Sequence, residues 1–374
     1  MSFQQMQFDF VASVPLQAEL ISAVEAMAEA GVEDRGAIFT RRSVVDFILD
    51  LTGYTSDKPL YKTRLLEPAF GNGDFLLPAV KRLLDSLKGS QNGEEPDFAK
   101  LDGCLCAVEL HIPTFENTKA KLLALLTDND IPKPVAIRLV EGWLIQNDFL
   151  LTEFSGRFDF VAGNPPYVRQ ERISDVLLSA YRKRFSTLYD RADLYVPFIE
   201  CSLKLLKKGG TLGFICSDRW MKNRYGGPLR EMISRDYHLK VYVDMMDTDA
   251  FHSDVTAYPA ITIVSRQAAG ATRIAHRPEI DAAVFRKLAK ELSAPKLSGS
   301  VAVREIKGVT NGKEPWILDS SDQLAVIRRL EQSFPTLEEA GCKVGIGVAT
   351  GADSAFIGPF AALDVEADRK VPLV

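Results

Sequence analysis

Short apolar runs alternate with amphipathic stretches along the first 270 residues of the chain. The apolar runs predict buried strands that begin at residue 65 and lie at 103–110, 160–162, 211–216, 241–244 and 260–264. Helical spacing of apolar residues predicts helices at 16–30, 75–87 and 114–126, one that ends at Gly53 and one that starts at Asp193. Strands that alternate with helices indicate an α/β fold with a mostly parallel sheet.

The pattern changes from about residue 270. Helical spacing continues at 278–293 and 322–334, and a hairpin is predicted at 301–318 with its turn at Asn311-Gly312. The stretch 345–356 is rich in glycine. We therefore expect the α/β domain to be followed by a different C-terminal part.

The strand at 160–162 ends in Asn164-Pro165-Pro166-Tyr167. The prolines lack the N–H that a strand needs, so Asn164 is expected at the carboxyl end of a strand on a rigid turn. In open parallel sheets ligands bind at that edge. An amide oxygen, a proline carbonyl and an aromatic ring at one point suit a planar amine. A strand followed by an ordinary proline turn is the alternative.

A second informative stretch joins the strand at 65 to the helix at 75–87 through a glycine turn. Its spacing is neither that of the dinucleotide fingerprint nor that of a phosphate loop. A carboxylate before the turn would repel a pyrophosphate but suits an ammonium or a sulfonium. The turn therefore favours S-adenosylmethionine over NAD or ATP, and its residues are Glu67, Pro68, Ala69, Phe70, Gly71, Asn72 and Gly73.

Further acids follow later strands. Glu109 ends the strand at 103–110, a place where acids bind ribose hydroxyls in nucleotide-binding sheets. Asp148 could accept from an adenine amine while Phe149 packs on the base. For either acid taken singly, a solvated loop carboxylate is the commoner fate. Upstream, Thr40 or Ser43 is the candidate cap of the helix that ends at Gly53.

The chain has 374 residues, 46% of them hydrophobic, and a net charge of −5, which argues against a generally sticky nucleic-acid binder. Two local stretches, 168–191 and 202–230, are nevertheless basic. Both follow the Asn-Pro-Pro-Tyr segment and are expected to flank the proposed site, so phosphate contact is the functional interpretation and a solvated helix end is the alternative. The candidates for DNA contact are Arg169, Arg172, Arg219, Lys222 and Arg224.

Five cysteines and four histidines are scattered without Cys-x-x-Cys or other metal-ligand spacing. We therefore expect neither a structural zinc nor disulfides. The N-terminus lacks the charge pattern of a signal peptide, and no apolar run reaches the length of a membrane span. These features predict a soluble, cytoplasmic protein.

Taken together, these motifs resemble the N6-adenine DNA methyltransferases of type II restriction–modification systems whose cofactor motifs precede the catalytic motif, the gamma order. The resemblance covers about residues 33–268 and, more weakly, 342–357. It implies a class I S-adenosylmethionine-dependent methyltransferase fold, which is a Rossmann-like, mostly parallel seven-stranded sheet flanked by helices, with a C-terminal extension. Arg41, where proline is usual, and Phe70, in place of a small residue, depart from the family pattern.

The resemblance also assigns roles to individual residues. It implies catalysis by direct methyl transfer to an adenine that has left the helix. The Asn164 oxygen and the Pro165 carbonyl would accept the two amine hydrogens, while Tyr167 and Phe251 stack on the base. Tyr258 is the rival of Phe251. No metal is required. The implied cofactor residues are Thr40, Glu67, Pro68, Ala69, Gly71, Gly73, Glu109, Leu110, Asp148, Phe149, Asn164 and Phe198.

Four parts follow: a helical lead-in at 1–32, a methyltransferase domain at 33–268, an extension at 269–340 and the start of a target-recognition domain at 341–374. Because the chain stops at Val374, we expect that last domain to be truncated. The implied partners are double-stranded DNA and a cognate restriction endonuclease. The alternatives are a glutamine-amide protein methyltransferase, a guanine-N2 RNA methyltransferase, and a degenerate cofactor-binding subunit that only docks on DNA.

Overall fold

The structure is a computed structural model of the whole chain. It describes residues 14–31, 36, 38–89, 97–252, 258–297 and 299–318, with shorter stretches at 326, 329–331, 333–343, 357–362, 365–366 and 369–370. The chain divides into two compact units, Met1–Ser321 and Asp322–Val374. All helices and strands named below lie in the first unit.

A nine-stranded sheet forms the centre of the first unit, in the order β3-β2-β1-β4-β5-β7-β6-β8-β9. Five of its neighbouring pairs are parallel and three are antiparallel, which agrees with the mostly parallel sheet that was predicted. The strands are β1 Leu65–Glu67, β2 Leu105–Glu109, β3 Leu144–Gln146, β4 Phe158–Gly163, β5 Leu206–Ser217, β6 His238–Asp244, β7 Pro259–Ser265, β8 Thr272–His276 and β9 Arg304–Ile306.

The six strands predicted from apolar runs correspond to β1, β2, β4, β5, β6 and β7, and with β3 they make the seven that the resemblance implies. Strands β8 and β9 extend the sheet beyond that number. The expected domain boundary at residue 268 falls between β7 and β8, inside the continuous sheet. Strand β9 pairs with β8 in antiparallel fashion, so the hairpin predicted at 301–318 is wrong in its pairing. The Asn311-Gly312 turn is present, since the Glu314 N–H donates to the Asn311 carbonyl at 3.1 Å.

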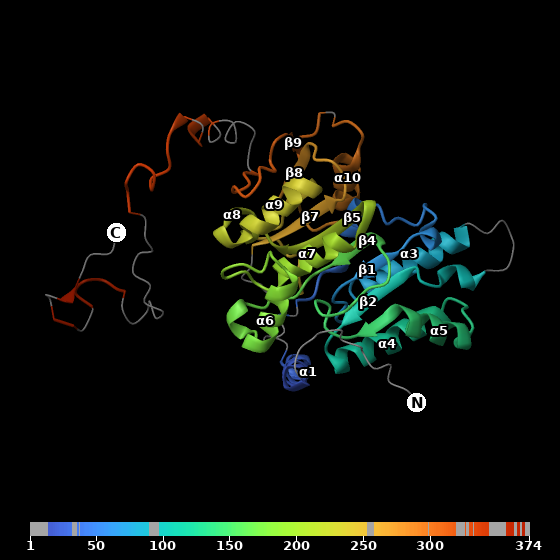
Figure 1. The fold of residues 1–374 in the computed structure, drawn as a ribbon. Helices are drawn as coiled ribbons and strands as arrows, with labels where there is room; N and C mark the ends of the chain where they lie inside the picture. Colours follow the sequence, from blue (N-terminus) through green and yellow to red (C-terminus); the bar gives the residue numbers. More distant parts are fainter. Residues whose placement is uncertain are drawn as a thin grey trace. The chain divides into compact units, whose positions relative to one another are not determined.

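Helices cover the sheet (Figure 1). One continuous apolar cluster joins residues of α2, α3, α4, α5 and α10 to the strands, with Phe47 stacked on Phe285 at 4.4 Å between ring centroids. Helices α7 and α9 contact β5 and β6 with side chains outside that cluster. The helices are α1 Val14–Glu29, α2 Arg42–Thr52, α3 Leu76–Gly89, α4 Ile112–Thr127, α5 Lys133–Trp143, α6 Asp175–Arg184, α7 Tyr195–Leu205, α8 Arg219–Lys222, α9 Gly227–Asp236 and α10 Ala282–Ser293.

Four helices, α5, α6, α8 and α9, were not predicted. Helix α5 has a proline in its first turn, and the apolar pattern did not reveal the helix. Strand β3 follows immediately after α5. Helix α6 lies in the segment that was interpreted only as polar and basic. It is capped by Ser174 and buries three side chains, Leu177, Leu178 and Tyr181. The charged residues of α6 obscure its amphipathic pattern, so the helix is stabilised mainly by tertiary packing.

Two predictions for the C-terminal part concern residues that the structure largely does not describe. The predicted helix at 322–334 falls largely outside the described residues, as does the glycine-rich stretch at 345–356. Among the described residues, no helix is long and apolar enough to cross a membrane.

Candidate active site

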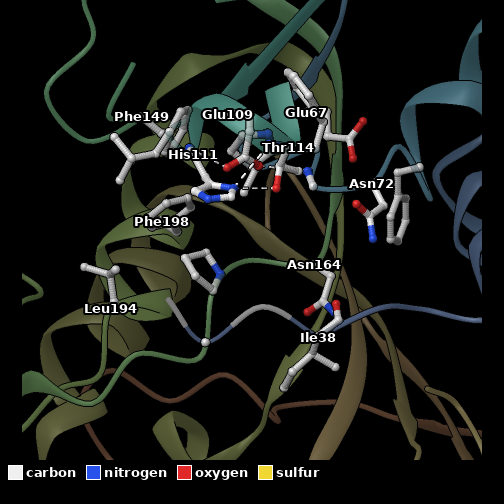
Figure 2. Close-up of a pocket in the computed structure, with 18 of the residues that line it drawn as sticks. Ile38, Glu67, Asn72, Glu109, His111, Thr114, Phe149, Asn164, Leu194 and Phe198 are labelled. Atoms are coloured by element: carbon white, nitrogen blue, oxygen red, sulfur yellow. Dashed lines mark hydrogen bonds between the residues drawn. The ribbon is translucent and has the colours of Figure 1, made fainter. Parts of the chain in front are cut away.

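A cavity of about 420 Å³ lies where three neighbouring parallel strands end. Strand β1 ends at Glu67, β2 at Glu109 and β4 at Gly163, immediately before Asn164. Because these strands are parallel neighbours, their carboxyl ends bring the three motifs to one edge of the sheet. Figure 2 shows the two glutamates by the strand ends, and Asn164 beside Ile38.

Most of the predicted cofactor residues line this cavity. Gly73 does not line it. Its φ of +89° and its tight packing against Leu77 and Thr118 instead explain the glycine in the turn. The eleven that line the cavity are Thr40, Glu67, Pro68, Ala69, Gly71, Glu109, Leu110, Asp148, Phe149, Asn164 and Phe198. Their proposed contacts with a cofactor remain predictions.

Glu67 is buried, with 1% of its surface exposed. Burial raises its pKa well above the usual range, and the nearby carboxyls of Asp74 and Glu109 raise it further. Its Oε2 atom has no hydrogen-bond partner among the described residues. An unpaired buried carboxylate oxygen on a cavity wall is costly, and a cationic ligand would offset that cost.

Glu109 organises the glycine turn. Its Oε2 accepts a hydrogen bond from the Gly71 N–H and its Oε1 from the His111 N–H, both at 2.9 Å. The carboxylate therefore ties the turn after β1 to the start of α4. His111 caps α4 through Thr114 and also lines the cavity, although nothing in the sequence singled it out.

Asp148 is more enclosed than the sequence suggested. Its Oδ1 accepts from the Leu150 and Leu151 N–H groups, and its Oδ2 accepts from the Tyr181 hydroxyl. Burial raises the pKa of Asp148, and these hydrogen bonds oppose the rise. An adenine amine would therefore share Oδ2 with Tyr181, a residue that was missed because α6 was not predicted.

The apolar end of the cavity is formed by aromatic rings. Phe149 packs on Phe198 with 4.9 Å between ring centroids, and Leu194 lies beside them on the cavity wall. The pair comes from two segments about fifty positions apart in the sequence. Figure 2 shows these three side chains together. Such a wall suits the face of a flat ring.

The Asn164 amide has a fixed orientation. Its Nδ2 donates to the Ile38 carbonyl at 2.9 Å and to Thr40 Oγ1 at 3.2 Å. Because a carbonyl can only accept, the nitrogen must face Ile38 and the oxygen must face away. Asn164 Oδ1 is buried and has no partner among the described residues. An acceptor is thus held ready for a donor.

The residues after Asn164 are clamped by their backbone. The Tyr167 N–H donates to the Gly36 carbonyl at 3.0 Å. Gly36 has a φ of +59°, and a Cβ there would lie 2.4 Å from the Tyr167 carbonyl carbon, so only glycine fits. Pro165 is buried and Pro166 lines the cavity. The Tyr167 hydroxyl has no described partner, and burial raises its pKa well above the usual range.

The structure places the two rival stacking aromatics differently. Phe251 is buried in the core cluster and is not among the residues that line the cavity. Its backbone bridges to Thr40. Tyr258 is 45% exposed, and its ring carries the Arg219 guanidinium at 4.6 Å. This arrangement gives neither ring a place on the cavity wall, and the stacking role stays a prediction.

Thr40 also differs from its predicted capping role. The N-cap of α2 is Arg41, whose side chain makes no capping hydrogen bond. The Arg41 guanidinium Nε instead donates to the Phe251 carbonyl at 3.0 Å. The expectation that Thr40 or Ser43 caps the helix is therefore wrong. Thr40 instead forms a β-bridge with Phe251.

The basic candidates gather at a second cavity of about 380 Å³. Three of the five candidates line it, Arg169, Arg172 and Arg219, together with Arg191. Lys222 instead lies 3.9 Å from Asp218, and Arg224 is outside the lining. The other lining residues are Glu171, Asp193, Asn223 and Tyr225. We call this group the arginine cavity.

Charge in the arginine cavity is unbalanced. Arg169, Arg191 and Arg219 form no ion pair with a described residue. Asp193 has its pKa raised to about 6 by burial and by Glu171, against the opposing pull of Arg169 and Arg219. Within the described part of the chain, no cluster of His, Cys, Asp and Glu could hold a metal ion.

Comparison with known proteins supports the sequence resemblance. Residues 104–251 match the Eco57I restriction-modification methylase family. The chain is 62% identical over 358 residues to the type II methyltransferase M.PaeR7I of Pseudomonas aeruginosa, covering 95% of this chain and 62% of that protein. It is 52% identical over 345 residues to M.XhoI of Xanthomonas vasicola, covering 91% and 63%. The chain thus spans less than two thirds of these relatives.

Solved structures share the fold. The M protein of the EcoKI type I restriction enzyme matches with a TM-score of 0.54 and 13% identity, over 82% of this chain and 73% of that one. The DrdV–DNA complex matches with a TM-score of 0.56 and 17% identity, over 81% and 33%. The predicted class I S-adenosylmethionine-dependent methyltransferase fold is confirmed, and so is the resemblance to restriction–modification methylases.

Proposed function

From its place among the restriction–modification methylases, we propose that this chain is the catalytic part of a DNA methyltransferase that methylates adenine N6 with S-adenosylmethionine. The carrying observation is the Asn164 amide, whose oxygen is buried and unpaired while its nitrogen is held by Ile38 and Thr40. Its orientation suits an incoming N–H donor.

The chemistry follows from two acceptors at one turn. Asn164 Oδ1 and the Pro165 carbonyl would accept the two hydrogens of the exocyclic amine. Those bonds draw the nitrogen lone pair out of conjugation with the ring and make it a better nucleophile. The acceptors are positioned before the base arrives, so they need little reorganisation during the reaction. Tyr167 would stack on the base, which leaves the duplex at a cost of a few kcal/mol.

The cavity fits S-adenosylmethionine by charge and shape. When bound, this cofactor supplies the methyl group. Glu67 would bind its cationic end, because the carboxylate is buried beside Asp74 and Glu109 with an unpaired oxygen. Phe149 and Phe198 would enclose its adenine. The carboxylates would repel a pyrophosphate, which disfavours NAD and ATP at the same place.

DNA is the proposed macromolecular substrate. The arginine cavity gathers guanidinium groups from the two basic stretches that follow the Asn-Pro-Pro-Tyr segment in the chain. It contacts the catalytic turn indirectly, because the Tyr225 and Tyr195 hydroxyls are 2.8 Å apart and the Tyr195 ring packs on Tyr167. Phosphates bound there would hold the strand beside the catalytic turn. Sequence recognition and a cognate endonuclease partner are part of the same proposal.

The deciding experiment compares wild type with Asn164→Ala. We expect Asn164→Ala to reduce methyl transfer to DNA by on the order of 10³-fold while S-adenosylmethionine binding, measured by calorimetry, persists. Normal methylation by a pure Asn164→Ala protein would contradict the catalytic assignment.

A second measurement tests the substrate class. Labelled methyl transfer from this chain is followed to pools of DNA, RNA and protein. Label in DNA adenine is expected. Label only in protein glutamine or only in RNA guanine would overturn the DNA proposal, and no label in any pool would favour a docking subunit.

A further inference from the structure

A short segment before α2 braces the catalytic turn at several points. Gly36 accepts from the Tyr167 N–H, Ile38 accepts from Asn164 Nδ2, and Thr40 Oγ1 accepts from the same nitrogen. The orientation of the Asn164 amide therefore depends on where these residues, Gly36 and 38–40, are held. We call these residues the brace. Thr40 is its last residue, and 2% of the Thr40 surface is exposed.

Thr40 is fixed from two sides. On one side it bridges to Phe251, and the Arg41 N–H donates to the Ala250 carbonyl at 3.0 Å. On the other side the Thr40 N–H donates to Asp74 Oδ2 at 3.0 Å. Asp74 belongs to the glycine turn after β1 and lies just before α3 begins at Leu76. The cofactor turn and the brace are thus joined by one carboxylate.

We propose that Asp74 is a positioning residue that sets the orientation of the Asn164 amide through Thr40. The inference rests on the proposed function, because it concerns the same catalytic amide. The path has three groups and two hydrogen bonds: Asp74 accepts from the Thr40 N–H, and the Thr40 hydroxyl oxygen accepts from Asn164 Nδ2. Neither the family motifs nor the spacing of the glycine turn singled out Asp74.

The surroundings of Asp74 explain why a carboxylate is used there. Burial raises the pKa of Asp74, while the Thr40 N–H, His252 and Lys121 oppose the rise. A charged acceptor makes a stronger hydrogen bond to an N–H than a neutral one does. The strength of that bond matters because the Thr40 hydroxyl must stay within reach of Asn164 while a base and a cofactor come and go. A shift of about 1 Å in such a group can cost about 10²-fold in rate.

The chain offers a matched control. Asp159 Oδ2 also accepts from a backbone N–H, that of Arg64, at 2.8 Å. It lies at the amino end of β4, whereas Asn164 follows the carboxyl end of the same strand. Asp159 also pairs with Lys207 at 2.7 Å. Asp159→Asn therefore removes a carboxylate that accepts from a backbone N–H without touching the brace.

The kinetic test separates rate from binding. We expect Asp74→Ala to lower kcat by about 30- to 100-fold. Because Asp74 also lines the cofactor cavity, the Kd for S-adenosylmethionine should change too, but by a smaller factor than kcat. In Asp74→Asn the amide oxygen can still accept from the Thr40 N–H, so its kcat should be roughly tenfold higher than that of Asp74→Ala. Asp159→Asn should keep the wild-type kcat. Loss of cofactor binding with kcat unchanged would overturn the proposal and make Asp74 a cofactor contact.

A double-mutant cycle with Thr40→Val tests the path itself. That variant removes the hydroxyl while keeping the backbone N–H. If Asp74 acts through Thr40, the combined loss in kcat will be clearly smaller than the product of the single losses. Losses that multiply would show independent action and overturn the path.

A readout without turnover keeps this proposal distinct from the proposed function. In protein labelled with ¹⁵N at asparagine, the Asn164 side-chain amide signals should shift and broaden in Asp74→Ala but not in Asp159→Asn. Unchanged signals would overturn the positioning role, whatever acceptor the enzyme methylates. Failure of wild type to methylate DNA, with the signals moving as expected, would instead count against the proposed function.

Discussion

The two cavities of the first unit carry opposite charge. The cavity at the strand ends is walled by carboxylates, with Glu67, Asp74 and Glu109 close enough for the other two to raise the pKa of Glu67. The arginine cavity is walled by four guanidinium groups and two acids. A protein with a net charge of −5 has therefore sorted its charges locally, and that sorting indicates one cationic and one anionic ligand.

The difference also teaches how the two cavities are built. The carboxylates follow buried strands directly, so the sheet fixes them. The arginines come from helical and loop segments around α6 and α8, and long side chains converge from both. The catalytic turn lies between these two kinds of wall. Tyr167 contacts the Tyr195 ring, and Tyr195 in turn contacts Tyr225 of the arginine cavity.

Among the tests of this comparison between the two cavities, the largest effect is expected from removing charge at the first cavity. Glu67→Gln should weaken S-adenosylmethionine binding by on the order of 30-fold or more, because a buried charge pair is lost. The pKa of Glu67 is raised in the fold, so its ionised form destabilises the free protein and Glu67→Gln should raise the melting temperature. Calorimetry and thermal unfolding measure both changes. Weaker binding without a rise in melting temperature would contradict the account of burial.

A smaller effect is expected from one arginine of the second cavity. Arg191→Gln should weaken DNA binding about 3- to 10-fold and reduce the slope of log K against log salt by about 1, with cofactor affinity unchanged. A salt titration of DNA affinity measures this. Arg235, which pairs with Asp236 on α9, supplies a matched control through Arg235→Gln. Equal losses in both variants would show that net charge, not the arginine cavity, governs binding.

The smallest effect concerns pH. Asp193 has its pKa raised to about 6, so it becomes neutral as pH falls from 7.5 to 5.5 and the cavity becomes more positive. DNA should therefore bind about two- to threefold more tightly at the lower pH. Glu171, Arg169, Arg172, Arg191, Arg219 and Tyr225 line the same cavity. The gain should disappear in Asp193→Asn, and a gain that persists there would assign the titration to another group.

The same shift predicts a stability effect of defined sign. The folded-state pKa of Asp193 lies above its ordinary value. Protonation of Asp193 therefore contributes favourably to the free energy of unfolding, fully at acidic pH, and this contribution is lost as pH rises through about 6. Asp193→Asn should flatten that part of the profile of unfolding free energy against pH. Denaturant unfolding at several pH values measures it.

The sequence by itself determined the strands and the residues that follow them. Buried strands of a parallel sheet are apolar on both faces, so they stand out as continuous runs, and the motifs at their ends fall on one edge. For this reason the sequence alone places Glu67, Glu109 and Asn164 at a common site, and all three line the cavity. The expected number of strands was too small, because β8 and β9 lie in segments whose apolar pattern is weak.

Only the tertiary structure decided the groups that act across distant segments. Asp74 meets Thr40, and Tyr181 meets Asp148, through contacts that no local pattern encodes. The burial of Phe251 away from the cavity was also decided by packing, because an aromatic residue in a loop is equally consistent with a core and with a binding site. Periodicity reports how a segment faces its own neighbours along the chain, whereas a site depends on which side chains packing brings together.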